Sequence, residues 1–236
     1  ILYPSTLLSQ VDASVGGKTA INHPQGKNMI GAFHQPTKVF IDVELLKSLP
    51  KIEISNGLSE VIKHALISDK KYFEWLETNM EDIFSLEPNA LEETITRSIE
   101  IKAEIVSEDE KERGIRKFLN FGHTFGHAIE LYGDFKEYSH GQSVAMGMIM
   151  AMKLSNIYES FSEEDFIRSR DLIIKANPKL NIKISFEEKK LVENMSVDKK
   201  RAGDNLTFIL LKEIGQAQIK TDIKEDDIAK AIRSLV

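Results

Sequence analysis

The chain has 236 residues, enough for one large domain or for one domain with part of another. Its net charge of −6 argues against binding to nucleic acid, and the absence of cysteine excludes disulfides and thiolate metal ligands. No apolar run reaches the roughly 18 residues of a membrane span, so we expect a protein of the reducing cytoplasm that contacts neither nucleic acid nor membrane.

Residues 1–50 contain four of the six prolines, which indicates loops and short strands, with Lys38–Asp42 as a buried strand. From Ser55 onward, the apolar residues recur with helical spacing, and the sequence predicts a mainly α chain. The segment 141–159 is apolar on nearly all sides and should cross the core. The pattern predicts helices at 55–67, 70–86, 89–112, 116–131, 141–159, 162–176 and 224–235, and a β-hairpin of 206–211 and 216–220 joined at Gly215.

The segment Gly16-Gly17-Lys18-Thr19 resembles the end of a nucleoside-triphosphate phosphate loop. That motif requires a glycine at the position of Asp12, so we exclude it. Together with Gly26-Lys27-Asn28, the segment suits binding of an anion by backbone amides and ammonium groups. A solvated loop is the alternative interpretation.

The helix predicted at 55–67 presents Glu60, Lys63 and His64 on the face opposite its apolar stripe. An exposed ion pair between Glu60 and Lys63 is the simplest interpretation of that face. The alternative is that these side chains belong to a site.

Lys102 lies within the apolar stripe of the helix predicted at 89–112, seven residues after Ile95. A lysine placed there must find an anion, lose its proton or extend its ammonium group to solvent. We therefore expect either a cation that points into a site or a lysine that reaches the surface.

A continuous helix over 116–131 would align Arg116, Asn120, His123 and His127 in one stripe, and Gly122 and Gly126 within it suggest close packing. A guanidinium group, an amide and two imidazoles are unusual on a surface helix. This stripe therefore indicates a functional site.

The pair His123 and His127 has the spacing of two metal ligands on a helix. Thr124 occupies the position where a metalloprotease requires glutamate, so peptide hydrolysis is excluded. With Glu60 as a carboxylate and a second imidazole, three ligands and an open position would make a catalytic zinc site. Local sequence leaves open whether that second imidazole is His127 or His140.

Several long blocks resemble the 3-dehydroquinate synthase family of sugar-phosphate cyclases, and the resemblance covers nearly the whole chain. The blocks are Pro4–Lys18, Gly26–Phe33, Gly57–Lys63, Arg116–His127, His140–Ala145 and Asp198-Lys199-Lys200.

This resemblance implies a two-domain α/β enzyme. Residues 1–50 would be the C-terminal remnant of a Rossmann-like NAD-binding domain, and residues 51–236 a helical metal- and substrate-binding domain. The family's glycine-rich dinucleotide segment would precede residue 1, so the chain looks like the C-terminal two-thirds of the enzyme. Ser5 and Ala13 depart mildly from the family pattern, which usually has Thr and Ser there.

The resemblance also implies roles for individual residues. One divalent metal, zinc or cobalt, would be held by Glu60, His123 and His140. The substrate pocket would contain Lys18, Asn28, Lys63, Lys102, Arg116, Asn120 and His127, with Lys199 or Lys200 as a further lysine. NAD would contact Ser5, Thr6, Asp12, Lys18, Lys27, Leu45, Leu46, Lys47 and Ser48.

The implied activity is that of a carbon–oxygen lyase of the shikimate pathway, which makes aromatic amino acids. The enzyme would be a homodimer that converts 3-deoxy-arabino-heptulosonate 7-phosphate to 3-dehydroquinate and phosphate. The reaction comprises NAD-dependent oxidation, phosphate elimination, reduction, ring opening and an intramolecular aldol step.

Three alternatives remain. Related cyclases of the inosose or valiolone type differ at the positions of Lys102, Asn120 or His127, where this chain keeps the dehydroquinate-synthase residues. Iron-type polyol dehydrogenases share the architecture but lack the Gly-Gly-Lys and Gly-Lys-Asn blocks. The chain could also be a catalytically inert helical fragment that binds metal or a partner.

Overall fold

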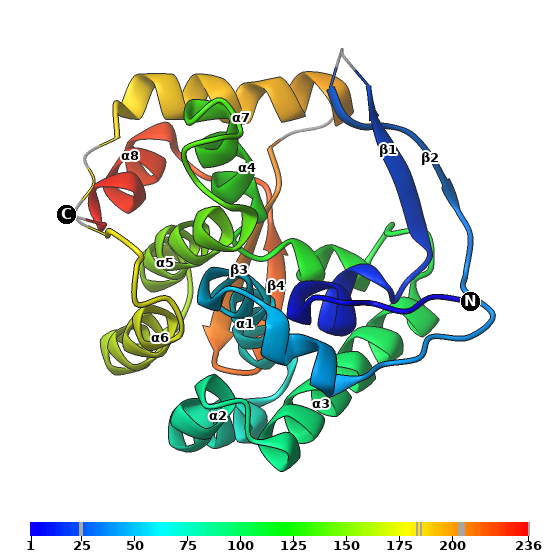
Figure 1. Cartoon of the computed structure of the whole chain (residues 1–236). Helices are drawn as coiled ribbons and strands as arrows, with labels where there is room; N and C mark the ends of the chain where they lie inside the picture. Colours follow the sequence, from blue (N-terminus) through cyan, green and yellow to red (C-terminus); the bar gives the residue numbers. More distant parts are fainter. Residues whose placement is uncertain (24–25, 183, 185, 203–205, 236) are drawn as a thin grey trace.

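The computed structural model describes residues 1–23, 26–182, 184, 186–202 and 206–235, without the side chains of residues 22–29 and 196–202. Helices pack around a central pair, α1 and α5, and two separate β-hairpins complete the fold (Figure 1). The elements are a π-helical turn (Ser9–Ala13), β1 (Lys18–His23), β2 (Gly26–Phe33), a 3-10 helix (Val43–Ser48), α1 (Lys51–Ser68), α2 (Lys70–Phe84), α3 (Pro88–Glu108), a 3-10 helix (Ile115–Asn120), α4 (His123–Tyr132), α5 (His140–Tyr158), α6 (Glu163–Ala176), α7 (Glu188–Ala202), β3 (Phe208–Glu213), β4 (Gln216–Lys220) and α8 (Glu225–Arg233).

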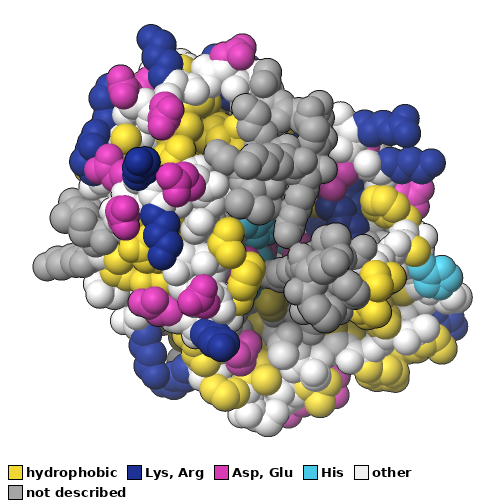
Figure 2. All heavy atoms as spheres, turned by 90° about the horizontal axis from the view of Figure 1, so that it is seen from above, with side chains coloured by type: hydrophobic (Ala, Val, Ile, Leu, Met, Phe, Trp, Pro, Cys, Tyr) yellow, Lys and Arg dark blue, Asp and Glu magenta, His cyan; other side chains and the backbone are white. Residues whose placement is uncertain are grey.

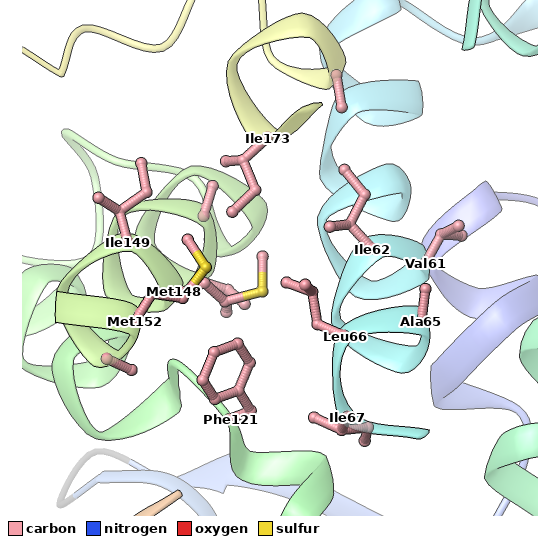
Figure 3. Close-up of a cluster of buried hydrophobic side chains, with 14 of the residues drawn as sticks. Val61, Ile62, Ala65, Leu66, Ile67, Phe121, Met148, Ile149, Met152 and Ile173 are labelled. Atoms are coloured by element: carbon pink, nitrogen blue, oxygen red, sulfur yellow. The ribbon is translucent and has the colours of Figure 1, made fainter. Parts of the chain in front are cut away.

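The core lies between α1 and α5, and both helices are buried on nearly all sides. Figure 3 shows Ile62 and Leu66 of α1 on one side of the cluster, with Met148 and Met152 of α5 on the other. Phe121 closes one end of this cluster. The prediction that the segment 141–159 crosses the core is therefore confirmed.

Two glycines allow α4 and α5 to approach at backbone distance. A Cβ on Gly147 would lie 2.1 Å from the carbonyl oxygen of Gly122, and one on Gly126 would lie 3.2 Å from the carbonyl oxygen of Ser143. A side chain at Gly147 would force the helices apart, because real Cβ atoms do not approach a backbone oxygen so closely. The close packing expected at Gly122 and Gly126 is confirmed.

The predicted continuous helix over 116–131 is wrong. The 3-10 helix Ile115–Asn120 ends at Phe121, which is extended at ψ 127°, and Gly122 adopts φ +77° before α4 begins at His123. A residue in the left-handed region cannot continue a right-handed helix. Arg116 and Asn120 therefore do not share a helical stripe with the two histidines.

The C-terminal hairpin β3–β4 forms close to its predicted place. Its strands pair antiparallel, with Ile209 opposite Ile219, and Gly215 takes φ +88° in the turn. The Gly215 amide donates a hydrogen bond of 2.9 Å to the carbonyl oxygen of Leu66, so the turn rests on the end of α1.

Short strands do occur in the first fifty residues, as the antiparallel pair β1–β2. Lys38–Asp42, however, is not a buried strand. Val39 forms one isolated parallel bridge with Leu2, and Phe40 is 42% exposed. The apolar run therefore reflects a short contact with the N-terminal residues, because no other described strand pairs with it.

The remaining helices agree with the prediction within a few residues, except that α1 begins four residues early, at Lys51, α3 ends four residues early, at Glu108, and α7 was not predicted. The sequence of α7 is rich in charge, and its buried apolar contacts come mainly from Leu191 and Met195. Residues 55–180, all of which are described, contain no strand.

The described helices include none that is long and apolar enough to span a membrane. Acidic and basic side chains are interspersed over the face drawn in Figure 2.

Candidate active site

Three side chains that could bind one metal ion meet where α1, α4 and α5 converge. Glu60 comes from the middle of α1, His123 is the first residue of α4 and His140 is the first residue of α5. Oε1 of Glu60 lies 3.6 Å from Nε2 of His123 and 3.4 Å from Nε2 of His140. One potential ligand atom from each residue lies within 4.8 Å of the other two.

These three residues fit a divalent cation. Glu60 is fully buried, and Lys63 is the cation that pairs with its carboxylate. Oε1 of Glu60 also faces Nε2 of both imidazoles, where one shared cation would satisfy all three atoms. Two imidazole nitrogens and one carboxylate oxygen match the three-ligand set of a catalytic zinc site.

The two imidazoles occupy different electrostatic environments. Burial lowers the pKa of His123 to about 3. Burial acts in the same direction on His140, but hydrogen bonds with Glu130 and Glu60 outweigh it and raise its pKa to about 9. Burial would also raise the pKa of Glu60, yet the neighbouring Lys63 and His123 hold it well below its usual range.

A group of cations lies beside this cluster. Lys63 is buried on α1 and forms an ion pair with Glu60. Lys102 of α3 is 6% exposed, and its Nζ donates a hydrogen bond of 2.8 Å to Oδ1 of Asp12. The interpretation of Glu60 and Lys63 as an exposed pair is wrong, and so is the alternative that Lys102 reaches solvent.

Asp12 joins the N-terminal segment to this charged group. Burial would raise its pKa, but Lys102 and Lys63 hold it well below its usual range. Burial lowers the pKa of Lys102 in spite of Asp12, whereas Glu60 and Asp12 raise the pKa of Lys63 against its burial. The result is a chain of alternating charges that leads from Asp12 to the candidate metal ligands.

A second group of potential ligands, Asp12, Glu60 and His64, also lies within 4.8 Å. Its additional carboxylate, Asp12, is already paired with the ammonium group of Lys102. His64 is fully buried 3.7 Å from Asp12, and burial lowers its pKa. We therefore assign this group to the ion-pair network and not to a second metal.

Arg116 is 1% exposed and holds the Gly16–Gly17 turn in place. Its Nη2 donates a hydrogen bond of 2.6 Å to the carbonyl oxygen of Gly16, and its Nη1 donates to the carbonyl oxygen of Glu110. Nε has no hydrogen-bond partner within the described part of the chain.

Comparison with known proteins settles the family. Models of the 3-dehydroquinate synthase N-terminal and C-terminal regions match residues 1–56 and 57–201. The chain belongs to the 3-dehydroquinate synthase family.

Curated family members are similar along nearly all of the chain. A 3-dehydroquinate synthase of Idiomarina loihiensis is 43% identical over 230 residues, and one of Thermodesulfovibrio yellowstonii is 42% identical over 232 residues. These matches cover 97% and 98% of the chain, but only 64% and 65% of the two relatives.

Solved structures of sugar-phosphate cyclases share the fold. A 2-deoxy-scyllo-inosose synthase complexed with carbaglucose-6-phosphate, NAD+ and Co2+ has a TM-score of 0.87 and 29% identity, covering 98% of this chain and 66% of its own. A 2-epi-5-epi-valiolone synthase from Streptomyces hygroscopicus, with NAD+ and Zn2+ bound, has a TM-score of 0.90 and 24% identity, covering 99% and 65%. The helix-rich dehydroquinate-synthase fold expected from the sequence is thus confirmed.

Three further residues expected in the substrate pocket lie near a candidate ligand or share a contact. His127 is exposed on α4, with its ring centroid 5.5 Å from that of His123, and it is not part of the candidate ligand group. Asn120 and Lys18 both contact Glu112, which lies between them. The roles of these residues remain predictions.

Six of the residues expected to contact NAD lie in two neighbouring segments, 5–6 and 45–48. Gln10 links the segments, because its Nε2 donates to the carbonyl oxygens of Pro4 and Asp42. Ser5 and Thr6 precede Gln10, whereas Leu45–Ser48 lie in the 3-10 helix that follows Asp42. Leu46 is fully buried, so its side chain is directed into the protein core.

Glu112 was missed in the sequence analysis. Its Oε1 accepts a hydrogen bond of 2.6 Å from Asn120, and its carboxylate forms an ion pair with Lys18. It has φ +58°, an uncommon conformation for a residue with a side chain. The only sequence signal was its position four residues before Arg116, in a charged run that resembles a solvated surface.

Four expected site residues, Lys27, Asn28, Lys199 and Lys200, lie outside the described side chains.

Proposed function

We propose that this chain carries the metal- and substrate-binding part of a 3-dehydroquinate synthase. The protein would convert 3-deoxy-arabino-heptulosonate 7-phosphate to 3-dehydroquinate and phosphate. The observation that carries this proposal is the convergence of Glu60, His123 and His140 beside two buried lysines. Identities of 43% and 42% to curated 3-dehydroquinate synthases support it over the other cyclases.

Glu60, His123 and His140 would hold the divalent cation, zinc or cobalt. When bound, this cation supplies Lewis-acid polarisation of a substrate hydroxyl, and NAD supplies a reversible hydride acceptor. Binding of NAD+ with Zn2+ or Co2+ in the two cyclase structures supports this pair of cofactors.

The chain's cations would bind the carboxylate and the phosphate of the substrate. Lys102 is suited to this role because Asp12 fixes its ammonium group in a largely buried position, where charge-assisted hydrogen bonds are strong. Arg116 offers an Nε that is not used by described residues, and Lys18 is half exposed at the start of β1. Lys63, Asn120, Asn28 and His127 would complete the pocket and fix the conformation of the substrate.

For NAD we propose contacts from Ser5, Thr6, Asp12, Lys18, Lys27 and the turn Leu45–Ser48. The link through Gln10 supports this assignment, because it holds the two segments together. We also propose that residues 1–50 belong to an NAD-binding domain and that 51–236 form the helical domain. The start of α1 at Lys51 supports this division. A cytoplasmic homodimer is proposed from the family alone.

An assay of the full-length native protein tests the proposed activity. With NAD and Zn2+, we expect phosphate release from 3-deoxy-arabino-heptulosonate 7-phosphate and none from glucose 6-phosphate. Release from glucose 6-phosphate alone would favour an inosose-type cyclase, the second candidate. No release from either substrate would contradict the proposed activity.

Lys102→Met tests the role of the buried cation. Methionine keeps the apolar stem, but the charge is lost, so turnover should fall by roughly 30- to 5,000-fold, the equivalent of about 2–5 kcal/mol. Lys71→Met, at an exposed position of α2, is the control and should turn over like the parent. Parental turnover by Lys102→Met would show that this lysine does not contact substrate.

A further inference from the structure

Glu130 is a buried carboxylate for which the sequence analysis assigned no role. It lies on α4, seven residues after His123 and therefore on the same helix face, and it is only 5% exposed. A carboxylate so far removed from water is costly unless a hydrogen-bond donor or a cation lies beside it.

The imidazole of His140 supplies such a donor. Nδ1 of His140 lies 2.9 Å from Oε1 of Glu130, whereas its other nitrogen, Nε2, lies 3.4 Å from Oε1 of Glu60. An ionised carboxylate can only accept a hydrogen bond, so the proton of this contact belongs to Nδ1. In the neutral ring, the lone pair is then on Nε2, which faces Glu60.

His123 shows the same arrangement with a different partner. Its Nδ1 lies 3.1 Å from the carbonyl oxygen of Phe121, which also can only accept, and its Nε2 faces Glu60 at 3.6 Å. Both rings thus present the same nitrogen toward Glu60. The backbone carbonyl of Phe121 orients the His123 ring, whereas the Glu130 side chain, which mutation can replace, orients the His140 ring.

His140 is the ligand that most requires such support. It is the first residue of α5, directly after the loop 133–139, and its side chain is 29% exposed, compared with 0% for Glu60. A capping box between Ser139 and Gln142 fixes the backbone at this point. The hydrogen bond to Glu130 is the side-chain contact that orients the ring.

We propose that Glu130 is a positioning residue that fixes the tautomer and orientation of His140 for metal binding. This inference rests on the proposed metal centre. Glu130 is not itself a ligand there, because it contacts the ring nitrogen that points away from Glu60. Helix α4 would thus supply one ligand, His123, and orient a second that belongs to α5.

The test is the affinity of the chain for Zn2+ and Co2+, measured by competition with a chelator. Glu130→Leu should bind both metals 10- to 100-fold more weakly than the parent, the range typical for loss of a carboxylate behind a ligating histidine. Glu130→Gln keeps an acceptor oxygen without the charge, so its loss should be smaller. Glu137→Gln, in the exposed loop between α4 and α5, is the matched control and should bind like the parent.

Two further measurements separate positioning from a merely structural role. The d–d absorption spectrum of the Co2+ form should change in both Glu130 variants, because the orientation of one ligand changes. The metal-free variants are also compared with the parent by urea unfolding. A loss of stability with parental affinity and an unchanged spectrum would overturn the proposal. If Glu130→Leu does not fold, the isosteric Glu130→Gln decides by the same criteria.

His123→Ala distinguishes failure of this inference from failure of the metal centre. Loss of metal by His123→Ala, with parental binding by both Glu130 variants, would overturn the role of Glu130 alone. Parental binding by His123→Ala would overturn the metal centre and the inference together.

Discussion

Glu60, His123 and His140, the proposed metal-ligand cluster, are held differently from the hairpin-side cluster of Lys18, Glu112, Arg116 and Asn120. The first is carried by helices that cross in the core, and backbone contacts between glycines fix their spacing. The second depends on a loop, a 3-10 helix and the start of β1, and its Lys18 is 49% exposed. Helix packing therefore determines the geometry of the metal-ligand cluster, whereas a few polar contacts determine that of the hairpin-side cluster.

Gly147→Ala should show the largest effect if packing sets the metal-ligand cluster. The new Cβ would meet the carbonyl oxygen of Gly122, directly before His123, so we expect a loss of roughly 3 kcal/mol in unfolding free energy and weaker metal binding. Urea unfolding measures the stability.

Gly126→Ala is the matched comparison on the same interface. Its Cβ would lie 3.2 Å from the carbonyl oxygen of Ser143, a tight contact that a small shift relieves. Alanine also favours the helix, so the stability should stay within about 1 kcal/mol of the parent. Equal stability of Gly147→Ala and the parent would show that the helix crossing is looser than the structure indicates.

Asp12→Asn tests the ion pair between Asp12 and Lys102 and should have an intermediate effect. The charge-assisted hydrogen bond from Lys102 would be lost, which should cost about 2 kcal/mol of unfolding free energy at pH 7. Glu44→Gln, which breaks the exposed pair with Lys47, is the control and should change little.

The pH dependence of this effect has a definite sign. The folded state holds the pKa of Asp12 below its value of about 3.9 in an unfolded chain. Its stabilisation is therefore complete above that value and is lost as the pH falls through the lower, folded-state pKa. The difference between Asp12→Asn and the parent should shrink in acid. A constant difference between pH 7 and pH 2 would contradict the ion-pair assignment.

Lys18→Met should have the smallest effect on stability. Its ion pair with Glu112 is half exposed, and such pairs contribute less than about 1 kcal/mol. Urea unfolding of this variant and of the exposed control Lys38→Met should therefore give nearly the same result as the parent. A loss above about 2 kcal/mol would mean that the hairpin-side cluster supports the fold as much as the helix crossing does.

The sequence predicts well wherever one local pattern is sufficient. Regular apolar spacing located most helices within a few residues, and Gly215 marked the hairpin turn. The position of Lys102 in an apolar stripe correctly raised the alternative of a buried cation. Each of these features depends on residues that are close together in the sequence.

Features that depend on tertiary contacts were missed. Gly122 was predicted to lie within a continuous helix, whereas it has φ +77° at a helix break and packs against Met148 of α5. In the sequence, Glu112 resembles an ordinary surface charge. Its contacts with Lys18 and Asn120 are visible only in the structure. Lys38–Asp42 has the composition of a buried strand, yet among the described residues it pairs only with Leu2. Which imidazole joins His123 could not be decided from spacing, because His140 belongs to another helix.

The metal content of three variants after dialysis against metal-free buffer is the sharpest test of the ligand assignment. We expect about one Zn2+ per chain in the parent and in His127→Ala, and almost none in His123→Ala or His140→Ala. Loss of metal from His127→Ala as complete as that from His123→Ala would contradict the assignment of Glu60, His123 and His140.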